Sequence, residues 1–404
     1  MHLTRGVHLT YCTNIHAGED LAAVRAALAQ HVTRVKRAMR PEAPFGVGLR
    51  LSNLASEQLA REGALAELRT WLDREGLYVF TLNGFPYGAF HGTRVKESVY
   101  EPDWRSPARL AYTNRLADQL AQLLPDGVSG SVSTVPCAWK AALTHRDDVG
   151  RMAEHMLQHA AHLHALRERR GVTVSLALEP EPGCFLETID DAVRFFETQL
   201  FSPRAATRFR ALTGIAPRDA LPALQRHLGL CLDTCHAAVE FEDPAQIFGV
   251  LERAGIGIKK LQLSAGLRIP RLNTEALDAV AAFADNVYLH QTVQQQAGVL
   301  TRHADLPDAL RQAASAGPQA SEREWRVHCH VPVFLESFGV LESTRAFLVA
   351  VLERQRAGVL SEHLEVETYT WDVLPAALRE GDVAVAIARE LNFVLSVLDG
   401  EPGR

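Results

Sequence analysis

The sequence contains no long apolar run. No stretch approaches the roughly twenty consecutive apolar residues that a membrane-spanning helix needs. Residues 1–6 lead directly into a β-rich run and lack the continuous apolar core of a secretion signal. We therefore expect a cytoplasmic protein without a membrane span.

Cysteine is rare, and positive charge is in the minority. Six cysteines stand at irregular spacings along 404 residues, unlike the disulfide framework of a small secreted domain, so reduced thiols are expected. The formal net charge of -6 argues against a nucleic-acid partner, because a duplex would be repelled on average. The expected partner is a small-molecule metabolite.

A glycine-rich dinucleotide fingerprint is also missing. The turn after the first predicted strand, residues 13–18, reads TNIHAG. This disfavours an open doubly wound sheet that binds a dinucleotide.

Short β-rich runs alternate with longer amphipathic runs along the chain. The predicted strands are residues 7–13, 45–52, 77–82, 128–135, 172–179, 228–233, 258–264 and 364–370. Apolar residues recur every three or four positions between them, which predicts helices at 21–39, 56–74, 107–124, 147–170, 189–200 and 244–254. This alternation predicts an α/β protein, a (β/α)8 TIM barrel in which residues 1–404 form a single domain.

Two segments are too long for a minimal barrel. The aromatic loop 83–106 follows the third strand and is expected to form a lid over the barrel mouth. Residues 265–357 are expected to form an insertion before the last strand, with a hairpin at 287–303 and an extra strand at 325–331. Either 258–264 or 325–331 is then the seventh barrel strand.

Acidic and histidine residues follow several strands at the point where each ends. Glu179, Asp233 and Glu367 end or follow apolar runs, and His328 and His330 share one face of the extra strand. The carboxyl ends of barrel strands meet at one mouth, so these groups are expected to converge on a metal or a substrate.

Several motifs resemble a known superfamily. The segments LEP at 178–180 and DTCH at 233–236, together with Glu367, are similar to the xylose-isomerase-like barrels that include sugar isomerases and epimerases. A closer likeness lies in LTYCTNIH at 9–16, VHCHVP at 327–332 and VETYTWD at 366–372. These segments resemble the EboE-type metabolite-traffic proteins, a bacterial branch that accompanies export or processing of secondary metabolites.

The superfamily resemblance implies one divalent cation, with Mn, Zn, Mg and Co as candidates. Glu179, Asp233 and Glu367 match three of its four ligands, but the strand that should supply a histidine carries Gln262 instead. Two alternatives remain for the fourth ligand: an imidazole from His328 or His330, or the side-chain carbonyl of Gln262.

The resemblance also implies a reaction, namely isomerisation or epimerisation of a small sugar-like or hydroxycarbonyl metabolite. Glu179 and Glu367 would exchange the proton, and His236 would hydrogen-bond a substrate oxygen. Other residues expected to bind substrate are Glu181, His16, Trp139, His290 and Arg268.

Two other functions remain open. One is a metal-dependent hydrolase or lyase of the same fold. The other is a barrel that binds a metabolite without turnover, which the missing histidine on strand 258–264 favours and the retained Glu179, Asp233, His236 and Glu367 disfavour.

Overall fold

A nearly closed parallel barrel forms the main body of the protein. The computed structural model describes residues 1–39, 44–92, 94–285, 287–315, 323–375 and 381–400. The barrel strands are β1 His8–Tyr11, β2 Phe45–Arg50, β3 Leu77–Asn83, β4 Gly130–Thr134, β5 Val174–Leu178, β6 Leu228–Asp233, β7 Ile258–Leu263 and β14 His363–Val366. Their order in the sheet is β1-β14-β7-β6-β5-β4-β3-β2, and a parallel bridge between Cys12 and Gly48 joins its two ends. The predicted (β/α)8 barrel is confirmed.

The barrel interior is filled by side chains, including one enclosed ion pair. Strands β5 and β6 are buried along their whole length, as expected for parallel strands covered on both faces. Inside the barrel, Lys260 of β7 pairs with Glu365 of β14, and both side chains are fully enclosed. A Cβ atom at Gly48 would collide with the Glu365 carboxylate, so this position requires glycine.

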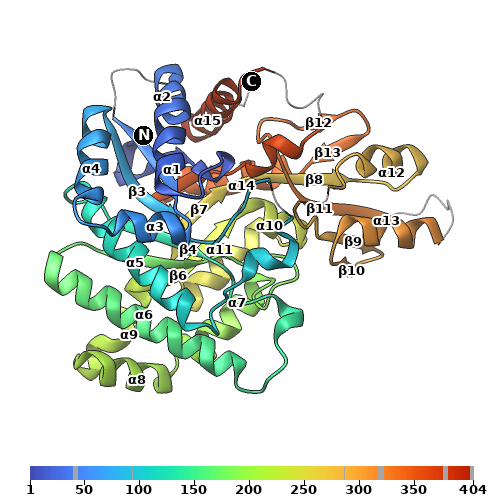
Figure 1. Ribbon diagram of the computed structural model, residues 1–404. Helices are drawn as coiled ribbons and strands as arrows, with labels where there is room; N and C mark the ends of the chain where they lie inside the picture. Colours follow the sequence, from blue (N-terminus) through green and yellow to red (C-terminus); the bar gives the residue numbers. More distant parts are fainter. Residues whose placement is uncertain (40–43, 93, 286, 316–322, 376–380, 401–404) are drawn as a thin grey trace.

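Helices surround the barrel (Figure 1). They are α1 Leu21–Ala27, α2 Thr33–Met39, α3 Asn53–Leu59, α4 Ala64–Arg74, α5 Pro107–Leu123, α6 Asp148–Arg170, α7 Ile189–Phe195, α8 Pro203–Thr213, α9 Pro217–His227, α10 Thr234–Val239, α11 Pro244–Arg253, α14 Arg345–Ala357 and α15 Val383–Asp399. Helices α5, α8, α9 and α11 begin at a proline, whose missing N–H leaves no donor unpaired there. The helix predicted at 56–74 is wrong in one respect, because a turn at Gly63, with φ of 80°, divides it into α3 and α4.

A second, antiparallel sheet lies between β7 and β14 in the sequence. Its strands are β8 Ala265–Ile269, β9 Thr292–Gln296, β10 Val299–His303, β11 Arg323–Val331, β12 Ser337–Phe338 and β13 Leu341–Ser343, in the order β10-β9-β11-β8-β13-β12. Helices α12 Thr274–Ala281 and α13 Leu306–Ser315 belong to the same region, which projects to the right of the barrel in Figure 1. Its own apolar cluster includes Leu267, Val280 and Trp325.

The structure decides between the two candidates for the seventh barrel strand. Strand β7 pairs with β6 and β14, whereas β11 pairs with β8 and β9 in the second sheet. Strands β9 and β10 form a hairpin whose turn contains Ala297 and Gly298, with φ of 50° and 79°. Two positive φ values are the requirement of a tight hairpin turn, which explains the glycine. In the described residues, no helix is long and apolar enough to cross a membrane.

Candidate metal centre

Three carboxylates meet at the mouth of the barrel. Glu179 directly follows β5, Asp233 ends β6 and Glu367 directly follows β14. All three side chains are buried, and one oxygen of each lies within 4.8 Å of the others. The prediction that these strand ends converge therefore agrees with their positions.

His330 brings an imidazole to the same place from the second sheet. Its Nε2 lies 4.0 Å from Asp233 Oδ2. Its Nδ1 donates a hydrogen bond of 2.7 Å to the backbone oxygen of Glu367, so the lone pair of the neutral ring is on Nε2. Burial lowers the pKa of His330 to about 4, which keeps this lone pair free near neutral pH.

Hydrogen bonds hold Asp233 through Oδ1, which leaves Oδ2 available to bind a metal ion. Its Oδ1 accepts hydrogen bonds from the backbone N–H groups of Cys235 and His236 and from the Ser264 hydroxyl, at 2.7, 3.0 and 2.6 Å. Asp233 thereby caps helix α10. Burial alone would raise its pKa, but the nearby His236, His330 and these hydrogen bonds hold the pKa of Asp233 below its usual value.

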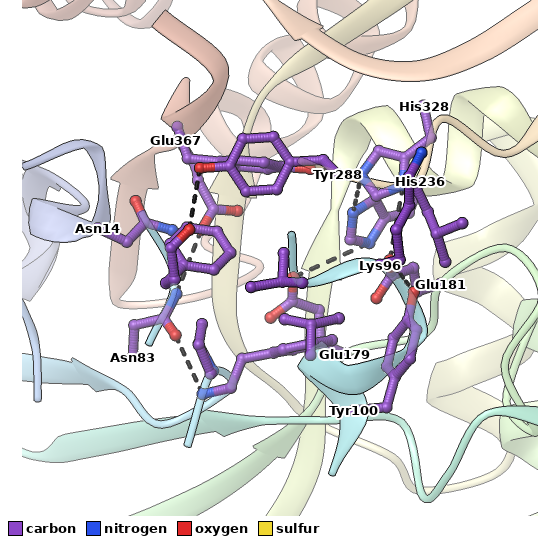
Figure 2. Close-up of a pocket in the computed structure, with 17 residues that line it drawn as sticks. Asn14, Asn83, Lys96, Tyr100, Glu179, Glu181, His236, Tyr288, His328 and Glu367 are labelled. Atoms are coloured by element: carbon purple, nitrogen blue, oxygen red, sulfur yellow. Dashed lines mark hydrogen bonds and ion pairs between the residues drawn. The ribbon is translucent and has the colours of Figure 1, made fainter. Parts of the chain in front are cut away.

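Glu367 is oriented by two side-chain amides that were not predicted to belong to the site. Its Oε1 accepts hydrogen bonds from Asn14 Nδ2 at 2.7 Å and Asn83 Nδ2 at 3.2 Å (Figure 2). Burial, reinforced by neighbouring carboxylates, raises the pKa of Glu367 and of Glu179 well above the usual value. Two carboxyl groups that resist ionisation therefore face each other across the site.

The donor set fits a divalent metal ion. Within the described part of the chain, Glu179 Oε2, Asp233 Oδ2 and His330 Nε2 are buried atoms that have no hydrogen-bond partner. Buried polar atoms normally have a partner, because leaving them unpaired is costly. Asp233 connects these atoms, because one of its oxygens lies within 4.8 Å of an oxygen of Glu179 and its Oδ2 lies 4.0 Å from His330 Nε2. All three atoms are of types that ligate metals, and they match the chemistry of a cation bound by carboxylates and one imidazole.

The side-chain oxygen of Gln262 already has a hydrogen-bond partner, whereas Nε2 of His330 has none among the described residues. The Gln262 oxygen accepts a hydrogen bond of 2.9 Å from the Cys231 thiol, and the register partners of Gln262 on the neighbouring strands are Asp233 and Glu365. His330, by contrast, has a free nitrogen within 4.8 Å of an Asp233 oxygen. The imidazole alternative therefore has the better geometry for the fourth ligand.

A second cluster adjoins the first and contains His236, His328 and Glu181. The Nε2 atoms of His236 and His328 lie 3.0 Å apart, and an oxygen of Glu181 lies within 4.8 Å of both rings. Glu181 Oε1 accepts hydrogen bonds from the Tyr100 hydroxyl at 2.7 Å and from Gln291 Nε2 at 3.3 Å. Tyr100 and Gln291 were not predicted as site residues, because neither stands directly at the end of a barrel strand.

A cavity that is partly open to solvent lies over these groups. Its polar lining includes Glu179, Glu181, Glu367, His236 and His328 (Figure 2). The apolar part of its lining comes from the loop after β3, the segment before β9 and the turn after β14, with Phe85, Pro86, Phe90, Val95, Val99, Tyr288, Leu289 and Tyr369. The loop predicted at 83–106 therefore forms part of the wall of this cavity.

Two histidines that we predicted to bind substrate lie outside the lining of the cavity. His16 is buried, stacks on His31 with ring centroids 4.2 Å apart, and contacts the Tyr11 hydroxyl. His290 is also buried, with Nε2 2.6 Å from Asp285 and Nδ1 bonded to the backbone oxygen of His328. His290 thus supports the strand that carries His328 and does not face the cavity.

Trp139 and Arg268 are also absent from the lining. Trp139 stacks on the ring of Tyr100, with centroids 5.1 Å apart, and so supports a cavity residue from behind. Arg268 lies on β8 and forms ion pairs with Glu324 and Glu342, both from the second sheet. Those pairs neutralise the charge of Arg268. They could not be predicted, because both partners lie far from Arg268 in the sequence.

Comparison with known proteins finds no match to a protein-family model and no match among curated proteins. Solved structures do show a likeness. A xylose isomerase-like TIM barrel protein from Mycobacterium smegmatis in complex with magnesium is 12% identical, with 98% of this chain and 96% of that chain covered and a TM-score of 0.49. The IOLI protein with a binding zinc atom is 12% identical, with coverage of 98% and 100% and a TM-score of 0.47. A D-tagatose 3-epimerase-like protein is 12% identical, with coverage of 98% and 99% and a TM-score of 0.48. Identities this low assign neither a reaction nor a metal to this chain.

Proposed function

We propose that this protein is a metal-dependent isomerase or epimerase of a small sugar-like or hydroxycarbonyl metabolite. The observation that carries the proposal is the set of three buried, unpartnered atoms on Glu179, Asp233 and His330 beside Glu367. In this proposal, these four residues hold one divalent ion of the class Mn, Zn, Mg or Co.

The chemistry depends on two carboxyl groups with raised pKa values. When bound, a divalent cation polarises a substrate carbonyl and makes the adjacent carbon more acidic. The carboxylate form of Glu179 would remove a proton from that carbon, and the protonated form of Glu367 would return one, because burial raises the pKa of both groups and so makes the protonated form accessible. Asn14 and Asn83 keep Glu367 Oε1 in place during this exchange.

The lining of the cavity determines the polarity of the substrate. Glu181 and His236 offer polar contacts to substrate oxygens, while the rings of Phe90, Tyr288 and Tyr369 exclude water from above. A compact polyhydroxylated molecule fits this combination.

We further propose that the protein belongs with the EboE-type metabolite-traffic branch and acts in processing of a secondary metabolite. The support is the likeness of segments 9–16, 327–332 and 366–372. In the same proposal, residues 1–404 form one domain, and 265–357 are an insertion in it.

Proton exchange with solvent tests the reaction. The metal-loaded protein is incubated in deuterated water with a panel of ketoses, hydroxyketones and cyclitol ketones, and deuterium at carbon is measured by mass spectrometry. We expect incorporation by the wild type and at least a hundredfold less by Glu179→Gln and Glu367→Gln. Glu240→Gln is the matched control, since Glu240 is buried but pairs with Arg302 outside the cavity lining. No exchange with any substrate, despite bound metal, would favour the hydrolase, lyase or binding-protein alternatives.

A further inference from the structure

The charged groups in the lining of the cavity are mostly of one sign. Three carboxyl groups line it, those of Glu179, Glu181 and Glu367. Among the described lining residues, Lys96 is the one lysine, and no arginine is present. The charge that remains on Lys96 therefore decides whether the cavity can hold an anionic group.

Asp305 neutralises Lys96. The Nζ atom of Lys96 lies 2.6 Å from Asp305 Oδ2, and the two side chains are only 8% and 16% exposed. Asp305 Oδ1 accepts hydrogen bonds from the backbone N–H groups of His290 and Leu306, both at 3.0 Å, so this carboxylate is fixed in place. Little charge is left on Lys96 to attract a phosphate or carboxylate group of a substrate.

A divalent ion in the proposed metal centre would not reverse the sign of the site. Glu179, Asp233 and Glu367 meet there, and Glu181 lies in the same cavity lining. Of the four negative charges that these groups carry when ionised, one divalent ion neutralises two. A phosphate group, with about two negative charges, would add repulsion in a space that water screens poorly.

Backbone N–H groups do not compensate for the missing cations. TIM barrels often bind phosphate with the loops after strands seven and eight and with the N-terminus of a helix there. Here β7 leads directly into β8 of the second sheet. Helix α10, after β6, is capped by Asp233, which accepts from the N–H groups of Cys235 and His236, and helix α15, after β14, is capped by Asp382. Carboxylates thus already bind the N–H groups at the start of both helices.

Another part of the lining is apolar. The rings of Phe90, Tyr288 and Tyr369 contact one another, with centroids 5.2, 5.5 and 5.2 Å apart. Val95 and Val99 pack in the same cluster. The Tyr288 hydroxyl donates a hydrogen bond of 3.2 Å to the backbone oxygen of Phe90, so it is engaged within the cluster. A surface of this kind gains free energy when an apolar group of a ligand covers it.

We propose that the substrate is a neutral molecule with its hydroxyl and carbonyl groups at one end and an apolar or aromatic group at the other, and that the site rejects phosphorylated and carboxylated compounds. This inference rests on the isomerase or epimerase function proposed above. The hydroxycarbonyl end lies at Glu179 and Glu367, and the other end packs against the rings of Phe90 and Tyr288. Asp305 determines specificity, because it neutralises the cation that would otherwise attract an anion.

Two matched pairs of probes test the proposal. Dihydroxyacetone and dihydroxyacetone phosphate differ only in the anionic group, and hydroxyacetone and phenacyl alcohol differ only in a methyl or a phenyl group. Dissociation constants are measured by ligand-observed NMR on the full-length protein in the presence of Mg²⁺, and deuterium exchange at carbon is followed in parallel. We expect phenacyl alcohol to bind at least tenfold more tightly than hydroxyacetone. We expect dihydroxyacetone phosphate to bind at least tenfold more weakly than dihydroxyacetone.

Asp305→Asn tests the exclusion of anions. This substitution keeps the shape of the side chain but leaves the charge of Lys96 unpaired. The ratio between the dissociation constants of dihydroxyacetone phosphate and dihydroxyacetone should therefore fall about tenfold. Asp308→Asn is the matched control, because Asp308 lies on the same helix α13 but pairs with Arg311, outside the cavity lining.

Phe90→Ala tests the apolar part of the lining. It should remove most of the preference for phenacyl alcohol over hydroxyacetone, because the phenyl group loses its contact surface. Phe248→Ala is the matched control, since Phe248 is a buried aromatic residue on α11, outside the lining. Circular dichroism identifies a Phe90 variant that fails to fold, in which case the wild-type preference and Asp305→Asn decide.

The outcomes separate this proposal from the function on which it rests. Dihydroxyacetone phosphate that binds as tightly as dihydroxyacetone, or phenacyl alcohol that binds no better than hydroxyacetone, overturns the substrate class even if deuterium exchange supports the reaction. The expected preferences without exchange in any probe support the substrate class as a property of the cavity and contradict the isomerase. An unchanged ratio in Asp305→Asn overturns the role of Asp305.

Discussion

His330 Nε2 lies 4.0 Å from Asp233 Oδ2, although the first residue belongs to the second sheet and the second to the barrel. The two lie near each other because β11 ends beside Ala265, immediately after β7. His330 thus brings a candidate metal ligand from outside the barrel to the acids at the strand ends.

This relationship predicts unequal effects of substitutions at His330 and Gln262. His330→Ala should lower the affinity of the carboxylate site for Mn²⁺ at least tenfold, because it removes a free imidazole nitrogen. Gln262→Met retains the volume of the side chain but removes its carbonyl, and should leave the affinity within about twofold. Calorimetric titration of metal-free protein measures both. The opposite ranking would make Gln262 the ligand.

Asn14 is predicted to control the ionisation of Glu367. Its hydrogen bond favours the charged carboxylate and so lowers the pKa of Glu367. Asn14→Ala should move the acidic limb of the kcat/KM profile to higher pH and reduce kcat by about 10–100-fold, as loss of a supporting contact does at metal sites. Asn392→Ala, at an exposed position on α15, is the control. An unshifted profile would show that Asn14 does not act through Glu367.

Removing one partner of the enclosed pair Lys260–Glu365 is predicted to reduce the free energy of unfolding strongly, whereas removing both charges is not. Lys260→Met leaves the Glu365 carboxylate buried without its cation and should reduce the free energy of unfolding by about 3–5 kcal/mol. The double variant Lys260→Met with Glu365→Gln removes both charges and should recover most of that loss. Urea unfolding at pH 8 measures both variants, and equal stability of the single and double variants would refute a role for the unpaired charge.

The raised pKa of Glu390 predicts that the free energy of unfolding depends on pH. Burial raises its pKa to about 7, even though Thr368 and the Val333 amide donate hydrogen bonds to it. The folded state then holds this proton more tightly than the unfolded state, so stability falls as pH rises from about 4.5 to 7. The loss from this group is on the order of 3 kcal/mol and is complete above pH 7. Glu390→Gln should flatten that part of the curve in urea unfolding from pH 5 to 8; an unchanged slope would assign it to other groups.

The barrel was predictable because its strands are buried on both faces. Such strands appear in the sequence as continuous apolar runs, as in 174–178 and 228–232, and each is followed by a helical pattern. The acids after these runs were predictable for the same reason, since strand order alone brings their ends together.

The remaining parts of the site depend on contacts that no local pattern encodes. Asn83 and Gln291 are uncharged polar residues, which are common in loops, and only the fold shows that they bind Glu367 and Glu181. Arg268 was expected to bind substrate because its actual partners, Glu324 and Glu342, belong to strands that are distant in the sequence. The choice between His330 and Gln262 required the antiparallel pairing of the second sheet.

In the proposed metal centre, the position of His330 in the second sheet would also link metal binding to the docking of that sheet. A cation held jointly by Asp233 and His330 binds only the docked arrangement, so by mass action it stabilises that arrangement, by about 2.7 kcal/mol at a hundredfold excess over Kd. Cation availability would then set how often the second sheet separates from the barrel. The ion would hold the second sheet against the barrel reversibly. Slower hydrogen exchange in β11 at higher cation concentration would indicate that the sheet separates from the barrel less often.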